Sequence, residues 1–302
     1  MWLVSGRLVM KKKLTQADVA FYREFGYVAP VDVMSPIDAK QLFLQFEDAE
    51  KRFPEALSAS SRTNAHLTFM CIDAIAHNEA ILDAVENLIG SDFYLRESVI
   101  FAKPPDNEGF VSWHQDAIYM GLTPYDFVNV WCALTESSDE AGCLRVIPGS
   151  HLGSLRAHED TFAEKNMLTR GHQIENVNDN LARNILLKPG QASFHHPKMI
   201  HGSLPNRSLN RRVGVAFWYV AAHVQLTVGK RFILPMRGRC PDTESTVLNR
   251  PEKDMSAESV AQRAMVRQNY ENIMYRGTDR ARRYLPLFIV GCFSRTDIES
   301  TT

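Results

Sequence analysis

The sequence WHQD at residues 113–116 places the imidazole of His114 and the carboxylate of Asp116 two positions apart. Side chains two residues apart on a strand point to the same side, so at a strand end these groups would converge on one point. His201, in the sequence KMIHGS, is the leading candidate for a third ligand. Two histidines and one carboxylate on one face of an octahedron form the facial triad of non-heme iron(II) oxygenases, which leaves three positions open. The pattern His-x-Asp is common by chance, so its context must decide.

An arginine eleven residues after His201 suggests what the open positions hold. A 2-oxo acid would take two of them as a chelate, and dioxygen would take the third. The distal carboxylate of 2-oxoglutarate needs a buried cation, and the planar guanidinium of arginine can donate two parallel hydrogen bonds to it. Arg211 and Arg212 precede the apolar run VGVAFWYV, and adjacent strand residues face opposite ways. We predict that Arg212 faces inward to this carboxylate, because an arginine buried without an anion is costly, and that Arg211 is a surface charge.

The composition is that of an ordinary globular chain. Of its 302 residues, 45% are hydrophobic and 23% are charged, and the net charge is -1. This balance predicts no general attraction to nucleic acid or membranes, and no run of 18 apolar residues is present. The five cysteines are scattered without a CxxC pair, which argues against a disulfide framework or zinc knuckle and favours a reducing compartment. We expect a cytoplasmic monomer or homodimer that acts on a small molecule, without a nucleic-acid or membrane partner.

Helical patterns occupy the N-terminal part of the chain. Residues 1–10 carry their positive charges after the apolar stretch, the wrong order for a secretory signal, so we interpret them as a tag or an upstream extension. Thr15 is typical of the N-cap of a helix that ends at Gly26. Ser35-Pro36 is typical of the start of a second helix. Apolar spacing predicts a third helix over residues 74–90.

Short β-rich segments separated by turns fill the middle of the chain, and residues 253–283 return to a helical pattern. The strands are expected in the segments 92–106, 127–136, 142–151, 182–203 (two strands) and 211–226. Helices before and after such strands, without βαβ alternation, indicate an α+β fold with a sandwich or barrel. Residues 154–182 have no clear pattern, and a long irregular segment in a compact domain is more often a functional lid than a linker.

The ordered set KPPD, WHQD, VWCALTE, GCLRVIPGSHLGSL and HGSLPNRS with a following RR resembles the phytanoyl-CoA dioxygenase family. The resemblance covers about residues 14–225, including an N-terminal helix ending in FGYV. It implies an α+β fold with a mainly β core, namely a double-stranded β-helix (a cupin-like jelly-roll of two facing sheets) flanked by N-terminal and C-terminal helices. We therefore predict one domain over residues 14–285, with its β core at about 91–228.

The resemblance also implies roles for individual residues. The iron(II) ligands of the family fall on His114, Asp116 and His201, which would form the catalytic centre. The family's arginine falls on Arg212 and the serine of its His-Gly-Ser falls on Ser203, and both would bind the distal carboxylate of 2-oxoglutarate. A tryptophan of the family falls on residue 131, so Trp131 would line the same pocket.

The carboxylate at Asp116 bears on the type of reaction. Related halogenases have alanine or glycine at this position, which frees a coordination site for chloride. The resemblance therefore implies hydroxylation of an unactivated C–H bond in a small-molecule or natural-product substrate, with release of succinate and carbon dioxide. Desaturation, epoxidation or cyclisation in secondary metabolism stays open, and so does a non-catalytic β-sandwich binding module with structural histidines. The substrate could be free, bound to coenzyme A or bound to a carrier.

Other residues near these motifs give weaker signals. His195 and His196 are adjacent, so at most one can face the site, and a structural role is the commoner one for such histidines. The basic stretch 231–239 would meet either an anionic substrate or solvent. The apolar stretch 285–293 would pack at an edge, form a dimer contact or be disordered.

Overall fold

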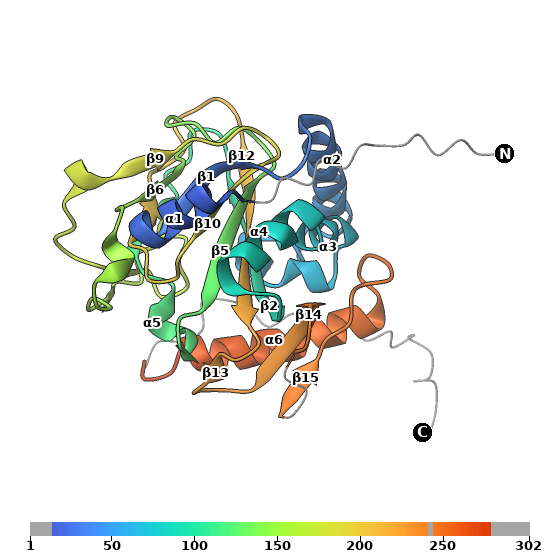
Figure 1. Ribbon diagram of the computed structural model, residues 1–302. Helices are drawn as coiled ribbons and strands as arrows, with labels where there is room; N and C mark the ends of the chain where they lie inside the picture. Colours follow the sequence, from blue (N-terminus) through green and yellow to red (C-terminus); the bar gives the residue numbers. More distant parts are fainter. Residues whose placement is uncertain (1–13, 241–243, 279–302) are drawn as a thin grey trace, which may run out of the picture.

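Two β-sheets form the centre of the computed structural model, which describes residues 14–240 and 244–278 (Figure 1). The larger sheet has the order β1-β10-β5-β12-β2-β14-β15, and the smaller has the order β3-β11-β6-β9. The strands of the larger sheet are β1 (Tyr27–Asp32), β2 (Phe93–Lys103), β5 (Phe127–Ala133), β10 (Gln191–His195), β12 (Arg212–Ala221), β14 (Arg231–Arg237) and β15 (Ser245–Val247). Those of the smaller sheet are β3 (Val111–His114), β6 (Leu144–Val146), β9 (Arg183–Ile185) and β11 (His201–Ser203).

The two sheets face each other across a shared apolar layer. Trp131 and Trp218 of the larger sheet and Leu144 and Val146 of the smaller one belong to the same buried cluster. The pairings in both sheets are antiparallel apart from that of β14 with β15. Two facing antiparallel sheets flanked by helices are the predicted α+β jelly-roll, so the expected fold class is confirmed.

Two of the predicted helices begin and end where their capping residues indicate. α1 (Gln16–Phe25) starts after Thr15, whose side chain accepts a hydrogen bond from the Asp18 backbone N–H, and it stops at Gly26 with φ +81°. Only glycine adopts this left-handed conformation without strain. α2 (Pro36–Arg52) starts after Ser35, with the proline in its first turn.

The third predicted helix is wrong in its extent, because the chain breaks there into two helices. α3 (Met70–Ala76) ends at His77, and α4 (Glu79–Ile89) follows it directly. The side chain of Asn78 accepts hydrogen bonds from the next helix at 2.9 Å and 3.2 Å, and such an N-cap starts a new helix. The last predicted helix is shorter than expected and is α6 (Ala257–Met274).

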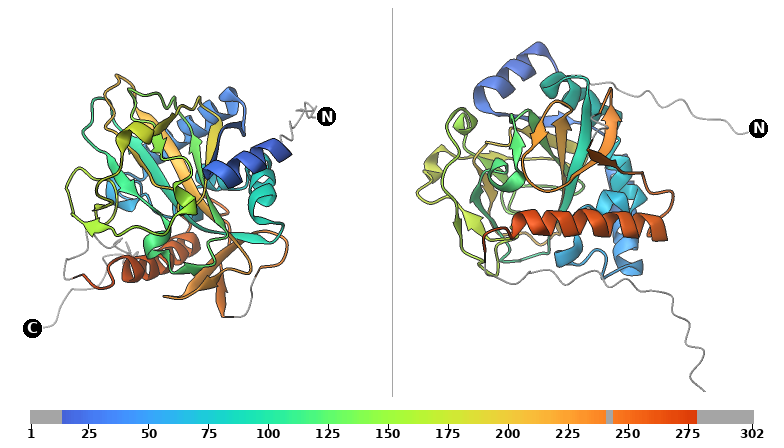
Figure 2. Two further views of the ribbon diagram at one scale, coloured as in Figure 1. Left: turned by 60° about the vertical axis from the view of Figure 1, so that its left-hand side comes forward. Right: turned by 90° about the horizontal axis from the view of Figure 1, so that it is seen from below.

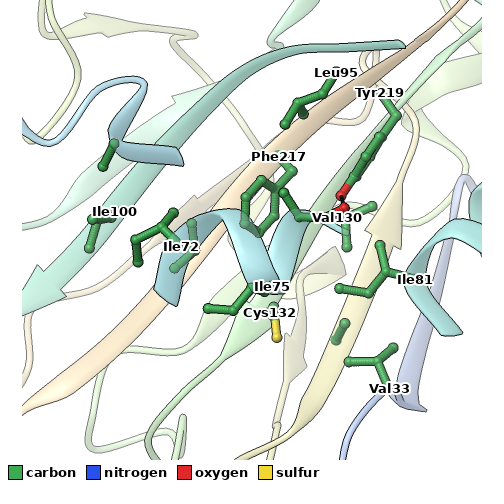
Figure 3. Packing of buried hydrophobic residues seen from close by; sticks show 14 of the residues in the cluster. Val33, Ile72, Ile75, Ile81, Leu95, Ile100, Val130, Cys132, Phe217 and Tyr219 are labelled. Carbon is green, nitrogen blue, oxygen red and sulfur yellow. Dashed lines mark hydrogen bonds between the residues drawn. The ribbon is translucent and has the colours of Figure 1, made fainter. Parts of the chain in front are cut away.

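α3 and α4 cover the outer face of the larger sheet, which gives the protein a second apolar layer (Figures 1 and 3). Ile72 and Ile75 of α3 and Ile81 of α4 are fully buried against strand residues such as Val130 and Phe217. The hydroxyl of Tyr219 on β12 donates a hydrogen bond of 2.7 Å to the carbonyl of Ala76 at the end of α3. This layer fixes β5, β12 and β2 from behind, so their opposite faces are held in place. α6 runs across another side of the molecule (Figure 2).

The β-structure extends beyond the predicted core of residues 91–228. β1 pairs with β10 at one end of the larger sheet, and β14 and β15 form the other end. β1 was overlooked because its sequence YVAPVD contains Pro30, which is tolerated on an edge strand but weakens a strand pattern.

The basic stretch 231–239 is not a solvated face along its whole length. It forms β14, and Arg237 makes ion pairs with Glu79, Asp83 and Glu86 of α4 at 2.6–2.8 Å. The apolar stretch 285–293 lies outside the described residues. Within residues 14–240 and 244–278, no helix is both long and apolar enough to cross a bilayer.

The irregular segment 154–182 packs onto β3 of the smaller sheet. The backbone N–H of Ile174 donates to the carbonyl of Trp113 at 2.7 Å, and the Asn166 side chain donates to Ser112 Oγ at 2.9 Å. The segment also contains the short strands β7 (Glu159–Asp160) and β8 (His172–Gln173). These hydrogen bonds fix the segment beside the end of β3.

Candidate metal centre and co-substrate pocket

Three side chains from the smaller sheet and the turn after it converge at its inner face. His114 ends β3, Asp116 precedes the short helix α5 (Ala117–Met120), and His201 begins β11. β3 and β11 pair with His114 directly opposite His201, which brings the two rings to a centroid distance of 4.1 Å. One ligand atom from each of the three residues lies within 4.8 Å of the others. Among the described residues, these three form the one cluster of His, Cys, Asp or Glu side chains that could hold a metal ion.

Both histidines are oriented by their own backbone. Nδ1 of His114 lies 2.9 Å from the carbonyl of Ser112, and Nδ1 of His201 lies 2.9 Å from the carbonyl of Met199. A carbonyl only accepts, so each Nδ1 carries a hydrogen and each Nε2 is the nitrogen available to a metal. These two Nε2 atoms lie 3.2 Å and 3.7 Å from Oδ1 of Asp116. This is the ring orientation that outer hydrogen bonds give to metal-binding histidines.

The carboxylate of Asp116 is held by two donors from the larger sheet. Oδ2 accepts hydrogen bonds from Asn129 Nδ2 at 2.6 Å and from Trp218 Nε1 at 3.1 Å. Burial by itself would raise the pKa of Asp116, but His201 and His114 hold that pKa well below its usual range. The group is therefore an anion whose other oxygen, Oδ1, faces the two imidazoles.

Trp218→Phe removes one of these two donors while keeping an aromatic ring. We expect iron(II) affinity to fall by about 10-fold or more, because outer-shell hydrogen bonds typically contribute 10- to 100-fold. Trp113→Phe is the matched control, since Trp113 Nε1 donates to Asp179 at 3.2 Å, away from the three residues. Iron binding is measured by titration with a competing chelator, and thermal unfolding of the metal-free protein checks for general damage. Equal iron affinity of both variants and wild type would contradict this role of Trp218.

A cavity opens beside the three residues, between the two sheets. The atom-free space within it and at its mouth is about 970 Å³, part of which is open to solvent. Its walls come from β2, β5, β10 and β12 of the larger sheet, from β3, β6 and β11 of the smaller sheet, from the segment 154–182 and from the end of α6. That segment contributes Met167, Leu168 and Thr169 to the lining, and α6 contributes Tyr270 and Met274.

Arg212 is a buried cation at this cavity. It is 2% exposed, its side chain makes no hydrogen bond with any residue in the described ranges, and its Nε is buried without a partner there. Its guanidinium lies 4.3 Å from the centroid of the Trp131 ring. Burial lowers the pKa of Arg212 to about 10. A guanidinium in such surroundings is costly unless a ligand supplies an anion.

The neighbouring arginine has a different place. Arg211 donates to both carboxylate oxygens of Glu50 at 2.6 Å and 2.7 Å, on the side facing α2. The choice of Arg212 as the inward arginine and Arg211 as the outward one agrees with these positions, although Arg211 is paired and not simply solvated.

The position of Trp131 depends on the lack of a side chain at Gly214. It lines the cavity, and a Cβ on Gly214 of β12 would come within 2.1 Å of its ring. Glycine at residue 214 therefore lets the indole lie flat against β12 beneath Arg212. Trp131 therefore both packs in the apolar core and lines the cavity.

Ser203 also faces the cavity, and a lysine that the sequence did not indicate lies behind it. Nζ of Lys103 donates to Ser203 Oγ at 2.7 Å and also to the carbonyl oxygens of Leu204 and Gly142. Burial, with Arg212 nearby, lowers the pKa of Lys103 to about 6. Because Ser203 Oγ accepts from the lysine, its own hydrogen is free to be donated into the cavity.

Comparison with known proteins agrees with this geometry. The family model described as phytanoyl-CoA dioxygenase (PhyH) matches residues 22–214, which is more than half of the chain. The chain belongs to this family. The resemblance seen in the sequence motifs is therefore confirmed.

The known proteins that are similar to this chain have names that describe varied chemistry. A probable alpha-ketoglutarate-dependent hypophosphite dioxygenase of Stutzerimonas stutzeri is 31% identical over 161 residues, which are 53% of this chain and 56% of that protein. The peroxisomal phytanoyl-CoA dioxygenase of Homo sapiens is 33% identical over 147 residues, 47% of this chain and 44% of that protein. The chain spans about half the length of these curated relatives. Among solved structures, the apo form of the non-heme monooxygenase ThoJ has a TM-score of 0.73 and 30% identity, covering 84% of this chain and 99% of that one.

The cofactors of this family are iron(II) and 2-oxoglutarate, and the residues of this chain fit both. The donor set of two imidazole nitrogens and one carboxylate oxygen suits iron(II) and leaves positions open. The unpartnered guanidinium of Arg212 suits a carboxylate in the same cavity.

His195 lines the cavity, whereas His196 does not belong to its walls. His195 is 1% exposed, neither of its ring nitrogens has a hydrogen-bond partner within residues 14–240 and 244–278, and its ring lies 4.8 Å from that of His201. Burial lowers the pKa of His195 to about 4, so the ring is neutral at pH 7. The expectation that at most one of the two histidines faces the site agrees with this arrangement, but the structural role favoured for both does not explain His195.

Glu97 also lines the cavity, and it was not indicated by the sequence. It lies on β2, is 4% exposed and lines the cavity together with Val99 and Phe101. Burial, with a smaller contribution from Asp116 and against an opposing one from Arg96, raises the pKa of Glu97 to about 8. No motif marks this residue, because its inward direction depends on how β2 pairs with β12.

The raised pKa of Glu97 predicts a pH-dependent stability. The pKa is about 8 in the folded chain against an ordinary 4.5, so the folded chain keeps a proton that the unfolded chain loses. That contribution is complete below about pH 4.5 and is lost as the pH rises to about 8. Glu97→Gln has no such loss. Its free energy of unfolding should therefore rise relative to wild type between pH 5 and pH 8 by on the order of a few kcal/mol. Denaturant unfolding of the metal-free proteins measures the difference, and a difference that does not change with pH would refute the prediction.

Proposed function

We propose that this protein is an iron(II)- and 2-oxoglutarate-dependent dioxygenase that hydroxylates an unactivated C–H bond of a small-molecule or natural-product substrate. In this proposal His114, Asp116 and His201 hold the iron and form the catalytic centre. The observation that supports it most is one cavity containing both an open three-ligand set and a buried arginine without an anion. When bound, iron(II) supplies dioxygen activation coupled to oxidative decarboxylation of 2-oxoglutarate, with one oxygen atom going to substrate and one to succinate.

The co-substrate is bound at the end of the cavity near Arg212. The guanidinium of Arg212 would donate two parallel hydrogen bonds to the co-substrate's distal carboxylate, and the hydroxyl of Ser203 would donate a third. Lys103 holds the oxygen of Ser203 from behind at 2.7 Å, which directs the hydroxyl hydrogen to the ligand. The ring of Trp131 closes the side of this pocket and excludes water from the ion pair. These residues orient the co-substrate toward the three ligands.

The substrate occupies the rest of the cavity, where it does not contact Arg212. The walls there include Val99, Phe101, Met120, Met167 and Trp218, so most of the contact surface is apolar. An apolar enclosure suits the reaction because it keeps water away from the reacting carbon. Gln115 fixes this enclosure on one side, because its side-chain amide bridges the Arg156 N–H and the Lys198 carbonyl, each at 2.8 Å.

Product analysis tests the proposed outcome. Purified protein is loaded with iron(II) and incubated in air with 2-oxoglutarate and a metabolite extract, and succinate and new products are followed by mass spectrometry. Hydroxylation predicts succinate release together with a product that gains one oxygen atom, and this atom should come from labelled dioxygen. A product that has lost two hydrogens would replace hydroxylation by desaturation. An iron-loaded protein that consumes no 2-oxoglutarate with any extract would overturn the enzyme proposal.

A further inference from the structure

Glu97 has no role in holding the metal or the co-substrate, and its side chain has no hydrogen-bond or ion-pair partner among the residues that the structure describes. It is 4% exposed at the cavity. Within residues 14–240 and 244–278, no group donates a hydrogen bond to its carboxyl group. No cationic nitrogen there lies within 4.0 Å of its oxygens, the longest distance of an ion pair. A buried carboxyl group normally has a hydrogen-bond partner, because a polar group removed from water without one is costly, and its ionised form also needs a cation. A ligand that supplies the missing donor is the simplest explanation for this arrangement.

A β-bulge aims Glu97 at the cavity. In the pairing of β2 with β12, Leu95 lies opposite Tyr219 and Glu97 lies opposite Trp218, so Arg96 is an extra residue between them. Regular alternation would place residue 97 on the side of Leu95, in the apolar layer beneath α3 and α4. The extra residue reverses the alternation. Bulges next to functional sites commonly redirect a side chain in this way.

The charges around Glu97 leave it available to a cation from outside the protein. Arg96 is its neighbour in sequence, but no ion pair between the two is formed. Arg212 is six residues from Trp218 along β12, which is about 20 Å of strand, so the co-substrate arginine serves a different part of the cavity. The other charged group that acts on Glu97 is Asp116, an anion, which makes this end of the cavity more attractive to a positive charge.

The position of Glu97 also relates it to the metal. Its partner across the strands, Trp218, donates to Asp116 at 3.1 Å, so Glu97 is one strand away from a residue that touches the proposed ligand set. The neighbouring walls, such as Val99 and Met274, are apolar, and Thr63 and Tyr270 add hydroxyl groups. A molecule bound here would be held by one charged contact and enclosed elsewhere by apolar surface.

We propose that Glu97 selects the substrate of this site, and that this substrate has an apolar body with one protonated nitrogen that the Glu97 carboxylate binds. This inference rests on the proposed function, since it places a substrate in the cavity beside the metal. Amines, guanidines and imidazoles share the required N–H donor and positive charge. The charge-assisted hydrogen bond fixes the nitrogen and thereby determines which carbon faces the metal.

The test compares probes that differ only in this charge. Three pairs serve: hexylamine with 1-hexanol, 3-phenylpropylamine with 3-phenyl-1-propanol, and N-acetyl-lysine methylamide with N-acetyl-norleucine methylamide. Binding to the full chain, loaded anaerobically with iron(II) and 2-oxoglutarate, is measured by calorimetry for wild type, Glu97→Gln, Glu97→Asp and Glu55→Gln. Glu55 is an exposed glutamate and provides the matched control. Circular dichroism checks that each variant is folded.

In at least one pair, wild type and Glu55→Gln should bind the cationic member about 10-fold or more tightly than the neutral one. Glu97→Gln should reduce this ratio to about twofold or less, and Glu97→Asp should keep part of it. The inference is overturned if wild type prefers no cationic member, or if Glu97→Gln keeps the full preference. The wild-type comparison decides the matter even if a variant does not fold. Absence of a visible iron–2-oxoglutarate absorption band in the same samples would instead count against the proposed function.

Discussion

Asp116→Ala should abolish 2-oxoglutarate consumption and lower iron(II) affinity by at least ~100-fold, which exceeds the effect expected for outer-shell changes. Oδ1 of Asp116 faces Nε2 of His114 at 3.2 Å and Nε2 of His201 at 3.7 Å, so the variant leaves the two imidazoles without the anion between them. The loss is specific to the metal, because the two histidines are oriented by backbone carbonyl groups that the substitution does not touch.

A matched aspartate separates this effect from a general loss of charge. Asp126 is about half exposed and pairs with His223 at 2.8 Å, so Asp126→Asn should leave iron binding and turnover unchanged. Metal content after dialysis against iron(II), together with 2-oxoglutarate consumption, measures both variants. Asp116→Ala protein that retains one iron per chain with wild-type affinity would remove Asp116 from the ligand set.

Arg212→Gln should raise the KM for 2-oxoglutarate by about 30-fold or more while leaving iron affinity nearly unchanged. Removing one partner of a buried, hydrogen-bonded charge pair typically costs ~2–5 kcal/mol in binding. The guanidinium of Arg212 is 2% exposed and has no hydrogen-bond partner in the described part of the protein, so the carboxylate of the ligand is its expected partner. Arg212→Lys should recover only part of the affinity, because an ammonium cannot form the bidentate contact.

The stability of the Arg212→Gln protein gives an independent readout. Without a ligand, the variant should be at least as stable as wild type, since it no longer buries an unpaired cation. Wild type should gain thermal stability when 2-oxoglutarate is added with the metal, and the variant should gain much less. Arg211→Gln is the control, because Arg211 pairs with Glu50 on the other side of the strand. A raised KM in Arg211→Gln with a normal KM in Arg212→Gln would reverse the assignment.

The sequence predicts best those features that depend on a single strand or a single helix cap. Strand alternation separates the directions of Arg211 and Arg212, and the structure places them accordingly. Thr15 and Ser35 start their helices because a side-chain cap is a local interaction. His114 and Asp116 do lie together, but Asp116 is in the turn between β3 and α5, so strand alternation alone does not place it.

Residues positioned by pairing between distant strands could not be found in this way. Lys103 meets Ser203 only because β2 ends beside the loop that follows β11, about 100 positions later in the chain. Asn129 and Trp218 reach Asp116 from the opposite sheet. Glu97 shows the limit most clearly, since an extra residue in β2 reverses the alternation on which a sequence-based prediction depends.

The errors in the fold have similar causes. The third predicted helix spans a break at Asn78, where a cap inside an apolar pattern starts a new helix. The predicted β core omitted β1 because Pro30 weakens its strand pattern, while an edge position tolerates proline. The single-domain boundary at residues 14–285 and the monomer or homodimer stay predictions.

Anaerobic titration of the protein with iron(II) and 2-oxoglutarate tests the central claim most directly. Chelation of the iron by the 2-oxo acid should produce a weak visible charge-transfer band that saturates at one equivalent of iron. His201→Ala should not form the band, and Arg212→Gln should form it only at much higher 2-oxoglutarate concentrations. A wild-type protein that gives no band at saturating iron(II) and 2-oxoglutarate would contradict the assignment of this cavity as an iron and 2-oxoglutarate site.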